Sequence, residues 1–444
     1  MPVDPVRDAA VSALLRVFEA QAPVDATLDR IIVRGKLSQR GNRFLTHIVY
    51  GVVRHKLLCD HVLQGLCEQP LDKLPPPVFM VLRLGVFQAL FCDNVTRPAM
   101  VHTAVELARR RGHPGLARLT NAVLRRVPKR LEDIALPDRT RDRINYLRLR
   151  YSMPRWIVRL WLTLYGEDDA ERMCARCNEP APPCLRVNTL KTDMETLEQQ
   201  LHAAGNTVAR IHPAIEGLMV SDGVHPLQSK RFQEGAFLVQ DPASMLAARL
   251  TAPMPGERVL DLCAAPGGKA THLAALAEDR ASVIALERYP QRIRRIRDNC
   301  DRLGVASVYP VCGDGLAPPF AEGRFDRVLV DAPCSGLGTL RRHPEIKWRT
   351  TPDTPARLAE TQRALLRTAA RLCKNGGLVV YSVCTLTREE TLDVVTELLS
   401  GASCVPEDGL EQYNTWKTAP GQYQTSPLDA AWDGFFLMRF RKRS

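Results

Sequence analysis

The sequence reads Val259-Leu260-Asp261-Leu262-Cys263-Ala264-Ala265-Pro266-Gly267-Gly268-Lys269 at the point that decides the fold of its C-terminal half. The apolar start predicts a strand, the small residues predict a tight turn, and a helix is expected to begin near Lys269. Glycine lets the backbone approach a ligand closely, and a helix N-terminus offers free N–H groups to a carboxylate. The spacing differs from the phosphate loop Gly-x-x-x-x-Gly-Lys-Ser/Thr. An ordinary turn between a strand and a helix would explain two glycines alone.

Apolar runs alternate with helical patterns from Arg258 onward. Strands are expected at 258–262, 282–286, 308–311, 325–330 and 378–382, with a helix at 290–303 and a last pair of strands near 422–424 and 434–441. Alternation of this kind indicates βαβ units and a mostly parallel sheet. We therefore expect an α/β domain over residues 241–444.

The first half of the chain has a different pattern. Apolar residues recur at helical spacing between residues 4 and 130, and no strand-type alternation interrupts them. This predicts an all-α domain over residues 1–140, followed by a helical connector over 141–180. A short strand near 185–187 and a helix near 192–204 then predict a small α+β segment over 181–240.

Composition places the chain among folded proteins. Of its 444 residues, 45% are hydrophobic and 25% charged, which excludes a disordered chain. No apolar stretch is long enough to span a bilayer, and the N-terminus lacks the apolar core of a signal peptide. Thirteen cysteines without a disulfide framework indicate reduced thiols and a cytoplasmic location. Cys174 and Cys177 have no second pair at zinc spacing, so we expect buried thiols and no metal site.

The positive charge is concentrated in the first third of the chain. Residues 1–150 hold 25 Lys/Arg against 14 Asp/Glu, whereas residues 151–444 hold 36 against 35. Such a basic region is typical of a protein that binds a polyanion. On charge alone, a solvated helical surface explains it equally well.

Acidic residues stand at the ends of successive predicted strands. Glu287 lies about twenty residues beyond the glycine turn, where an acid can bind ribose hydroxyls, and Asp314 follows the third strand. The carboxyl ends of parallel strands form the crevice in which α/β sheets bind ligands. Because the phosphate loop is missing, S-adenosylmethionine fits this crevice better than a dinucleotide does.

Two cysteines follow strands at the same expected edge. Cys334 lies in Asp331-Ala332-Pro333-Cys334-Ser335-Gly336, and Cys384 lies in Tyr381-Ser382-Val383-Cys384-Thr385. One such cysteine is more often buried packing than a nucleophile. Two of them in one crevice, with an aspartate beside one, favour chemistry, because a thiolate can temporarily activate a ring carbon.

These motifs, in this order, resemble those of the RsmB/Sun family of RNA cytosine-5 methyltransferases. The stretches 49–54, 82–85 and 121–126 resemble its NusB-like RNA-binding domain, 185–188, 234–235 and 239–244 its middle segment, and 433–436 its end. The resemblance implies a multidomain fold: an all-α NusB-like domain, a small α+β segment and a Rossmann-like α/β methyltransferase domain.

The resemblance also implies roles for individual residues. S-adenosylmethionine is expected over the loop, with Glu287 at the ribose, Asp314 at the adenine side and Asp331 at the edge shared with the base. The loop residues expected to bind it are Cys263, Ala264, Ala265, Pro266, Gly267, Gly268 and Lys269. Cys384 would attack C6 of cytosine, Asp331 would hydrogen-bond N3 and the amino group, Cys334 would assist release, and Lys269 would orient the base or the cofactor.

The chain departs from the family pattern in three places. Glu287 stands where the family usually has Asp. The chain has Ser382-Val383-Cys384-Thr385 where the family usually reads Ser-Thr-Cys-Ser, and Glu389-Glu390-Thr391 where it usually reads Glu-Glu-Asn. The longer side chain of Glu287 can still reach a ribose, so affinity rather than activity is affected. The nucleophile itself is retained at Cys384.

The NusB-like part implies ribosomal RNA as the partner, with a single-stranded or loop cytosine of the 16S molecule as the target. We expect a monomeric enzyme that binds no metal and contacts no membrane. Three alternatives remain: an assembly factor with an inactive methyltransferase domain, a cytosine-5 methyltransferase of transfer RNA, and a NusB-type antitermination module joined to an unrelated enzyme.

Phosphate contacts are expected from part of the arginine-rich helix 290–303, and further basic residues are expected beside the crevice. These are Arg292, Arg294, Arg295, Arg297 and Arg302 on the helix, and Arg341, Arg342, His343 and Lys347 after Cys334.

Overall fold

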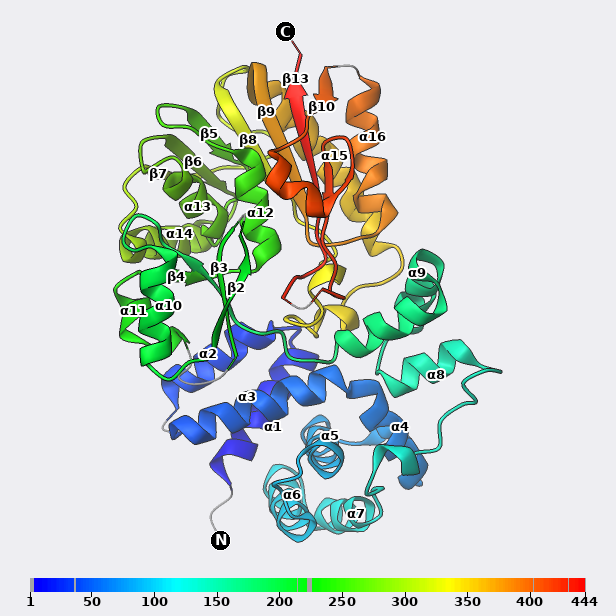
Figure 1. The fold of residues 1–444 in the computed structure, drawn as a ribbon. Coiled ribbons are helices and arrows are strands. Elements are labelled where there is room, and N and C mark those ends of the chain that lie inside the picture. The colour runs from blue at the N-terminus through cyan, green and yellow to red at the C-terminus, as the bar shows by residue number, and fades with distance from the viewer. Residues whose placement is uncertain are drawn as a thin grey trace. The chain divides into compact units, whose positions relative to one another are not determined.

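A computed structural model describes residues 4–35, 37–213, 215–221, 226–401, 403–429 and 431–443. The chain divides into two compact units (Figure 1). The first contains Met1–Glu179 and Leu340–Thr351, and the second contains Pro180–Thr339 and Pro352–Ser444. This division does not test the finer boundaries expected at residues 140, 180 and 240, which stay predictions.

The first unit is helical throughout its described residues, as predicted. Its helices are α1 (Pro5–Phe18), α2 (Val24–Arg34), α3 (Gln39–Arg54), α4 (Lys56–Leu66), α5 (Pro76–Phe91), α6 (Arg97–Arg111), α7 (Pro114–Arg125), α8 (Arg143–Arg150) and α9 (Arg155–Arg176). Side chains cap several of them: Asp4 accepts hydrogen bonds from the backbone at the start of α1, and Ser38 does so at the start of α3. Helix α5 is apolar on nearly every side because it lies in the middle of the bundle.

The same unit contains a segment from far along the sequence. Trp348 donates its indole N–H to Val53 O at 2.8 Å, and Lys347 Nζ lies 2.8 Å from Arg54 O. Glu345 accepts from Val24 N at 3.1 Å. The segment Leu340–Thr351 is therefore part of the helical core, although it follows Cys334 by only six residues.

The second unit begins with a small antiparallel sheet in the order β2-β3-β1-β4. Its strands are β1 (Cys184–Val187), β2 (Val208–His212), β3 (Ile215–Val220) and β4 (Phe237–Val239), with α10 (Met194–Ala203) and the short α11 (Lys230–Gln233) between them. Strand β1 is buried along its whole length, because it pairs on both edges and its two faces lie in different apolar clusters, Cys184 in one and Leu185 in the other. This confirms the expected α+β character of the segment.

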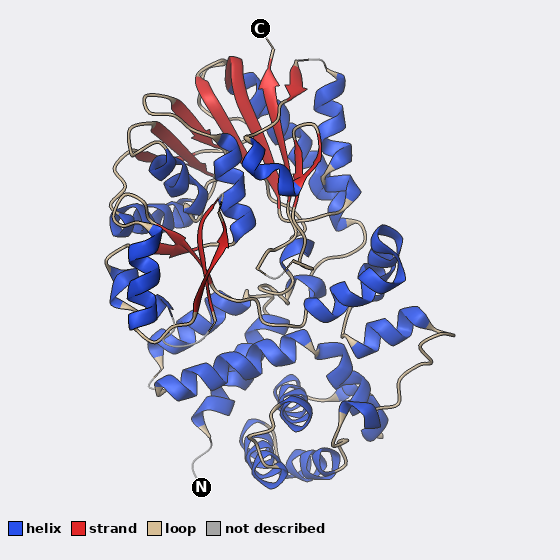
Figure 2. Cartoon of the chain, viewed as in Figure 1, coloured by secondary structure: helices blue, strands red, loops and turns tan. Residues whose placement is uncertain are grey.

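A nine-stranded mixed sheet forms the rest of the second unit (Figure 2). Strands β5 (Arg258–Asp261), β6 (Ser282–Glu287), β7 (Val308–Cys312), β8 (Phe325–Asp331) and β9 (Cys373–Val383) are parallel, in the order β9-β8-β5-β6-β7. Strand β13 (Phe436–Lys442) pairs antiparallel with β9 and carries β12 (Gln422–Gln424), β11 (Lys417–Ala419) and β10 (Cys404–Pro406). The expectation of a mostly parallel sheet was too strong, because four antiparallel strands extend the parallel five.

Helices cover both faces of this sheet. Alternate residues of each strand face opposite sides, so Val259 and Leu329 pack with α12 (Pro242–Thr251), α13 (Gly268–Leu276) and α14 (Pro290–Leu303). Leu260 and Val328 pack on the other side with α15 (Thr354–Leu372) and α16 (Leu392–Ser400). Two apolar cores result, one on each face, as in a Rossmann-like domain.

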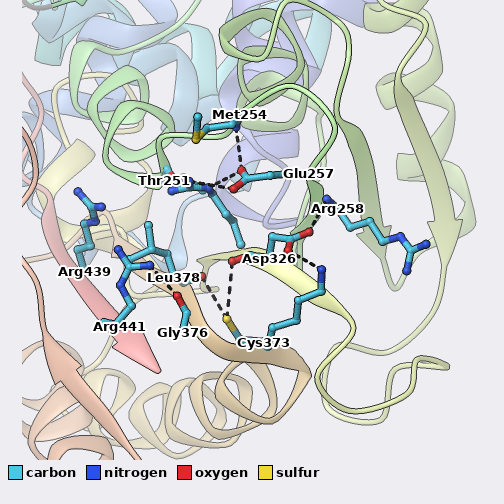
Figure 3. Close-up of polar contacts among 12 residues, drawn as sticks. Thr251, Met254, Glu257, Arg258, Asp326, Cys373, Gly376, Leu378, Arg439 and Arg441 are labelled. Carbon is cyan, nitrogen blue, oxygen red and sulfur yellow. Dashed lines mark hydrogen bonds and ion pairs between the residues drawn. The ribbon is translucent and has the colours of Figure 1, made fainter. Parts of the chain in front are cut away.

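Ion pairs fasten the amino ends of β5 and β8 (Figure 3). Asp326 accepts from Arg258 N at 2.9 Å and pairs with Lys374 at 2.5 Å, and Glu257 pairs with Arg327 at 2.5 Å. These contacts fix where neighbouring strands begin. At the other end Asp261 pairs with Leu329, so β8 continues two residues past β5 to Asp331, at the edge that holds the site.

None of the helices in the described part of the chain combines the length and the apolar character that crossing a membrane requires.

Candidate active site

The predicted site residues gather at the carboxyl edge of the parallel strands. Asp261 ends β5, Glu287 ends β6, and Asp331 ends β8. Asp314 follows β7, and Cys384 follows β9 directly. Because β8 lies between β5 and β9, the middle of this edge brings the aspartates and the cysteine motifs together.

Lys269 and Asp331 form an ion pair at this edge. Lys269 Nζ lies 2.7 Å from Asp331 Oδ2 and 3.3 Å from Ser244 Oγ, and Ser382 Oγ donates to Asp331 Oδ1 at 3.1 Å. Burial alone would lower the pKa of Lys269, but the charge and hydrogen bond of Asp331, together with the charge of Asp261, raise that pKa. Lys269 is thus a buried cation held against Asp331, not a lysine extended into solvent.

The two cysteines face each other across the same edge. Cys334 Sγ lies 3.1 Å from Cys384 Sγ, and both thiols are free. The hydrogen bond with Cys334, burial and the charge of Asp331 together raise the pKa of Cys384 well above its ordinary value, whereas Lys269 lowers it. Cys384 therefore rests as a thiol, and the approach of further positive charge would favour its thiolate.

Backbone contacts join the two cysteine loops to a third loop. Gly338 N donates to Cys384 O at 3.0 Å, and Gly434 N donates to Gly338 O at 2.9 Å. A Cβ at Gly338 would lie 1.8 Å from Gly434 O, so only glycine permits this approach. The ring of Phe435 lies 5.6 Å from Lys269 Nζ, which places this third loop at the ion pair.

The glycine loop is held tightly in place. Gly267 has φ +98°, and a Cβ there would lie 3.1 Å from Ile296 Cα. Asn299 donates to Pro266 O at 3.0 Å, and Arg292 donates to Ala265 O at 3.1 Å. Helix α13 starts directly after the turn, so its first free N–H groups face the crevice.

Arg186 fixes the same loop from the small sheet. Its guanidinium is buried and donates to Gly268 O, to Gln240 Oε1 at 2.6 Å and to Thr271 Oγ1 at 3.0 Å. Burial lowers its pKa to about 9. The small sheet thus contributes directly to the shape of the glycine loop.

Glu287 and Asp314 are partly engaged by neighbours. Glu287 Oε1 accepts from Tyr289 N at 2.9 Å, and Arg292 lies 3.3 Å from its other oxygen. Asp314 Oδ1 accepts from Leu316 N at 3.0 Å, and Arg288 lies 3.5 Å from Oδ2. Each acid keeps acceptor capacity for a hydroxyl or amino group at the crevice.

Family models match three parts of the chain. The 16S rRNA methyltransferase RsmB/F model matches residues 248–441, the NusB family model matches 4–129, and the ferredoxin-like domain of RsmF/B-like methyltransferases matches 153–225. A probable ribosomal RNA small subunit methyltransferase B from Bacillus subtilis is 36% identical over 99% of both chains. The chain belongs to the RsmB/F methyltransferase family.

Other comparisons agree with this membership. A ribosomal RNA small subunit methyltransferase B from Thermus thermophilus is 35% identical over 89% of this chain and 87% of its own. The crystal structure of PH0851 superposes over the full length of both chains with TM-score 0.84 and 29% identity. A methyltransferase homologue from Pyrococcus horikoshii covers 68% of this chain and 99% of its own, with TM-score 0.57 and 28% identity. As an RsmB/F protein, the chain is an S-adenosylmethionine-dependent methyltransferase.

The loop of this RsmB/F protein fits that cofactor, and Asp261 supplies the clearest sign. Its carboxylate is fully buried, and neither oxygen has a hydrogen-bond partner among the described residues. Burial and the charge of Asp331 raise the pKa of Asp261 to about 7. A buried carboxylate without a partner is suited to a cationic ligand, and S-adenosylmethionine carries positive charge. Asp261 is not among the residues predicted from the sequence to bind the cofactor, although it stands at the end of an apolar run.

The structure corrects part of the basic surface expected in this RsmB/F protein. Arg341 and Lys347 are 2% exposed, and Arg54 donates to Arg341 O at 2.9 Å. Both belong to the helical core instead of lining the crevice, because Leu340–Thr351 folds with the first unit. Arg302 donates to Phe232 O and Phe237 O, so it supports the small sheet.

The remaining arginines of α14 keep the expected placement. Ile293, Ile296, Cys300 and Leu303 turn toward the core, which leaves the arginines between them on the outer face. Arg294, Arg295 and Arg297 are exposed. Contact of these three with RNA phosphates stays a prediction. Among the described residues no group of three His, Cys, Asp or Glu side chains could hold a metal ion.

Proposed function

We propose that this protein transfers a methyl group from S-adenosylmethionine to C5 of a cytosine in small-subunit (16S) ribosomal RNA, through a covalent bond between Cys384 and C6. The observation that carries the proposal is the pair of thiols 3.1 Å apart beside the Lys269–Asp331 ion pair. Methylation of an oxygen or an amino group does not need a nucleophilic thiol, whereas C5 of cytosine is too weak a nucleophile without one.

Cys384 begins the reaction on the base. Its sulfur bonds to C6, the C5–C6 double bond opens, and C5 becomes nucleophilic. S-adenosylmethionine supplies the methyl group on a positively charged sulfur, whose charge also favours the nearby thiolate. Lys269 lowers the pKa of the same thiol, so two cations act on Cys384 once the cofactor is bound.

Asp331 and Cys334 complete the reaction. Asp331 hydrogen-bonds N3 and the amino group of the cytosine, and it relays to N3 the proton that Cys384 loses. After methyl transfer the C5 proton passes to water, the C5–C6 double bond forms again, the bond to Cys384 breaks, and N3 returns its proton through Asp331 to the two thiols. Cys334, in contact with the departing sulfur, assists this last step by returning a proton to it.

Ribosomal RNA as the substrate is supported by the family of the chain and by its charge. The NusB family model covers residues 4–129 of the basic region, and exposed arginines stand on α14 of the catalytic unit. A stacked base hides C6, so the cytosine must lie in a loop or be turned out of its helix. We expect the enzyme to act as a monomer in the cytoplasm.

The test is methyl transfer to small-subunit RNA. Bisulfite mapping of ribosomal RNA from cells with and without the gene should reveal one cytosine that loses protection when the gene is absent. An unchanged ribosomal map with altered transfer RNA would assign the enzyme to transfer RNA. Unchanged maps of both would leave an assembly factor with an inactive methyltransferase domain.

A further inference from the structure

A buried glutamate outside the reacting groups holds the two cysteine loops together. Glu390 ends the short 3-10 turn Arg388–Glu390 and is fully buried. Its Oε1 accepts from Ser335 N at 2.7 Å and from Gln362 Nε2 at 3.0 Å. Its Oε2 accepts from Ser335 Oγ at 2.5 Å and from Thr387 Oγ1 at 2.9 Å. Four donors on one buried carboxylate offset the cost of removing its charge from water.

These donors lie immediately beside the two thiols. Ser335 follows Cys334 in the chain, and its hydroxyl is also 3.0 Å from Thr385 Oγ1. Thr385 follows Cys384. Since Ser335 has one hydroxyl hydrogen and the carboxylate can only accept, Thr385 donates to Ser335 Oγ. Glu390 therefore bonds directly to Ser335, which follows Cys334, and is connected through Ser335 to Thr385, which follows Cys384.

The other side of the Cys334 loop is held by the same cluster. Gln362 on α15 donates to Pro333 O at 2.9 Å, so Cys334 is fixed from both neighbours. Tyr381 on β9 donates to Glu390 O at 2.8 Å and lies 3.1 Å from Gln362 Oε1. Side chains of helix α15 and strand β9 therefore hold the cluster in place.

We propose that Glu390 is a positioning residue that sets the separation of Cys334 and Cys384. The proposal rests on the covalent mechanism described above. Its carboxylate is fully buried and all its contacts are with protein donors, so it acts through Ser335 and Thr385 and not on the substrate. A displacement of about 1 Å at a reacting group lowers the rate by roughly 100-fold. Loss of the Glu390 charge should therefore slow the steps that use both sulfurs.

The experiment compares Glu390→Gln with Glu389→Gln in the full chain. Glutamine keeps the size of Glu390 but replaces one acceptor oxygen with an amide that faces donors. Glu389 is the neighbouring glutamate, partly exposed and outside the cluster, and serves as the matched control. Binding sites are first counted by titration with S-adenosylhomocysteine, and melting temperature is recorded for each variant. Adduct formation with RNA containing 5-fluorocytidine and single-turnover methyl transfer are then measured per binding site under reducing conditions.

Glu390→Gln should lose about 100-fold in the rate per site, with S-adenosylhomocysteine affinity and RNA KM within twofold of wild type. Thr387→Val removes one donor and keeps the charge, so it should lie between wild type and Glu390→Gln. If Glu390→Gln does not fold, Thr387→Val is the variant that tests the proposal. A lower melting temperature with an unchanged rate per site would overturn the proposal, because Glu390 would then serve only stability. Methyl transfer by the wild type without any adduct would instead refute the covalent mechanism, and the inference with it.

Discussion

Cys384 lies between opposing charges, and in the mechanism that we propose this balance keeps the thiol inert at rest and makes it reactive when the substrates bind. Asp331 raises its pKa and Lys269 lowers it. In the mechanism that we propose, Asp331 loses its negative charge when it engages the base, whereas the charge of Lys269 remains. The residues that would bind the cytosine would then also activate the nucleophile.

The neighbouring thiol gives a prediction about product release. Cys334→Ala should still form the Cys384–C6 bond but release it slowly, because the variant lacks the sulfur that contacts Cys384. A protein–RNA species that survives a denaturing gel should accumulate with unmodified RNA and S-adenosylmethionine, and the wild type should show far less of it. Loss of activity without such a species would show that Cys334 serves packing only.

Asp261 gives a prediction about pH. Folding raises the pKa of its carboxyl from 3.8 to about 7, so this group favours the folded apo protein fully below pH 4 and loses that contribution as pH rises to 7. Binding of a cation favours the ionised form, so S-adenosylmethionine affinity should rise about tenfold between pH 6 and pH 8. Calorimetry in buffers of different ionisation enthalpy should show proton release near pH 6. An equal pH dependence in Asp261→Asn would contradict this assignment.

Local motifs made part of the site predictable, and long-range contacts hid the rest. Cys334, Cys384 and Lys269 stand next to glycines and strand ends, which mark them in the sequence. Glu390 and Arg186 act through residues far along the chain, at Ser335 and Gly268, and no spacing rule connects such partners. Glu390 was visible only as part of the Glu389-Glu390-Thr391 departure, without a reason for its burial.

At the scale of elements, α7 is where RNA affinity can be tested. Arg118, Arg125, Arg126 and Lys129 are exposed on or just after this helix, and its opposite face is buried. Replacing these four by Gln should weaken RNA binding and lower the salt slope by roughly 0.7–0.9 for each RNA phosphate that the variant no longer neutralises. Affinity across a salt series is the measurement, with S-adenosylhomocysteine binding as the control for an intact catalytic unit. An unchanged slope would show that this surface is only solvated.

Strands were predictable where the sheet buries them on both faces. The five parallel strands were found from apolar runs because helices cover both sides. Strands β10 and β11 were missed, since each has three residues and pairs on an edge of the antiparallel extension. Short edge strands carry too few residues to show a period.

At the scale of the whole molecule, the segment Leu340–Thr351 links the helical unit to the cysteine loop. The sequence predicts an all-α domain over residues 1–140, and the carbonyl oxygens of residues 53 and 54 within it accept hydrogen bonds from Trp348 and Lys347. Burial also lowers the pKa of Lys347 to about 7, so its charged form depends on the carbonyl oxygen of Arg54. No local pattern reveals that a loop after Cys334 folds with helices three hundred residues earlier.

Removal of residues 1–140 should therefore expose this segment. Trypsin should cleave the truncated chain at Arg341, Arg342, Lys347 or Arg349 within minutes, while the full chain stays intact there, because buried backbone resists proteolysis. Cleavage sites would be read by mass spectrometry, with sites in exposed parts of α14 as the internal reference. Equal resistance in both chains would mean that the segment does not need the helical unit.

The covalent role of Cys384 is tested most directly by the mass of the protein after reaction with 5-fluorocytidine RNA. Fluorine at C5 cannot leave as the proton does, so the adduct cannot break down after methyl transfer. Wild type with S-adenosylmethionine should gain one nucleotide and one methyl group after nuclease digestion, on the peptide that contains Cys384, and Cys384→Ala should gain nothing while still binding S-adenosylhomocysteine. An adduct on Cys334, or methyl transfer retained by Cys384→Ala, would contradict the account.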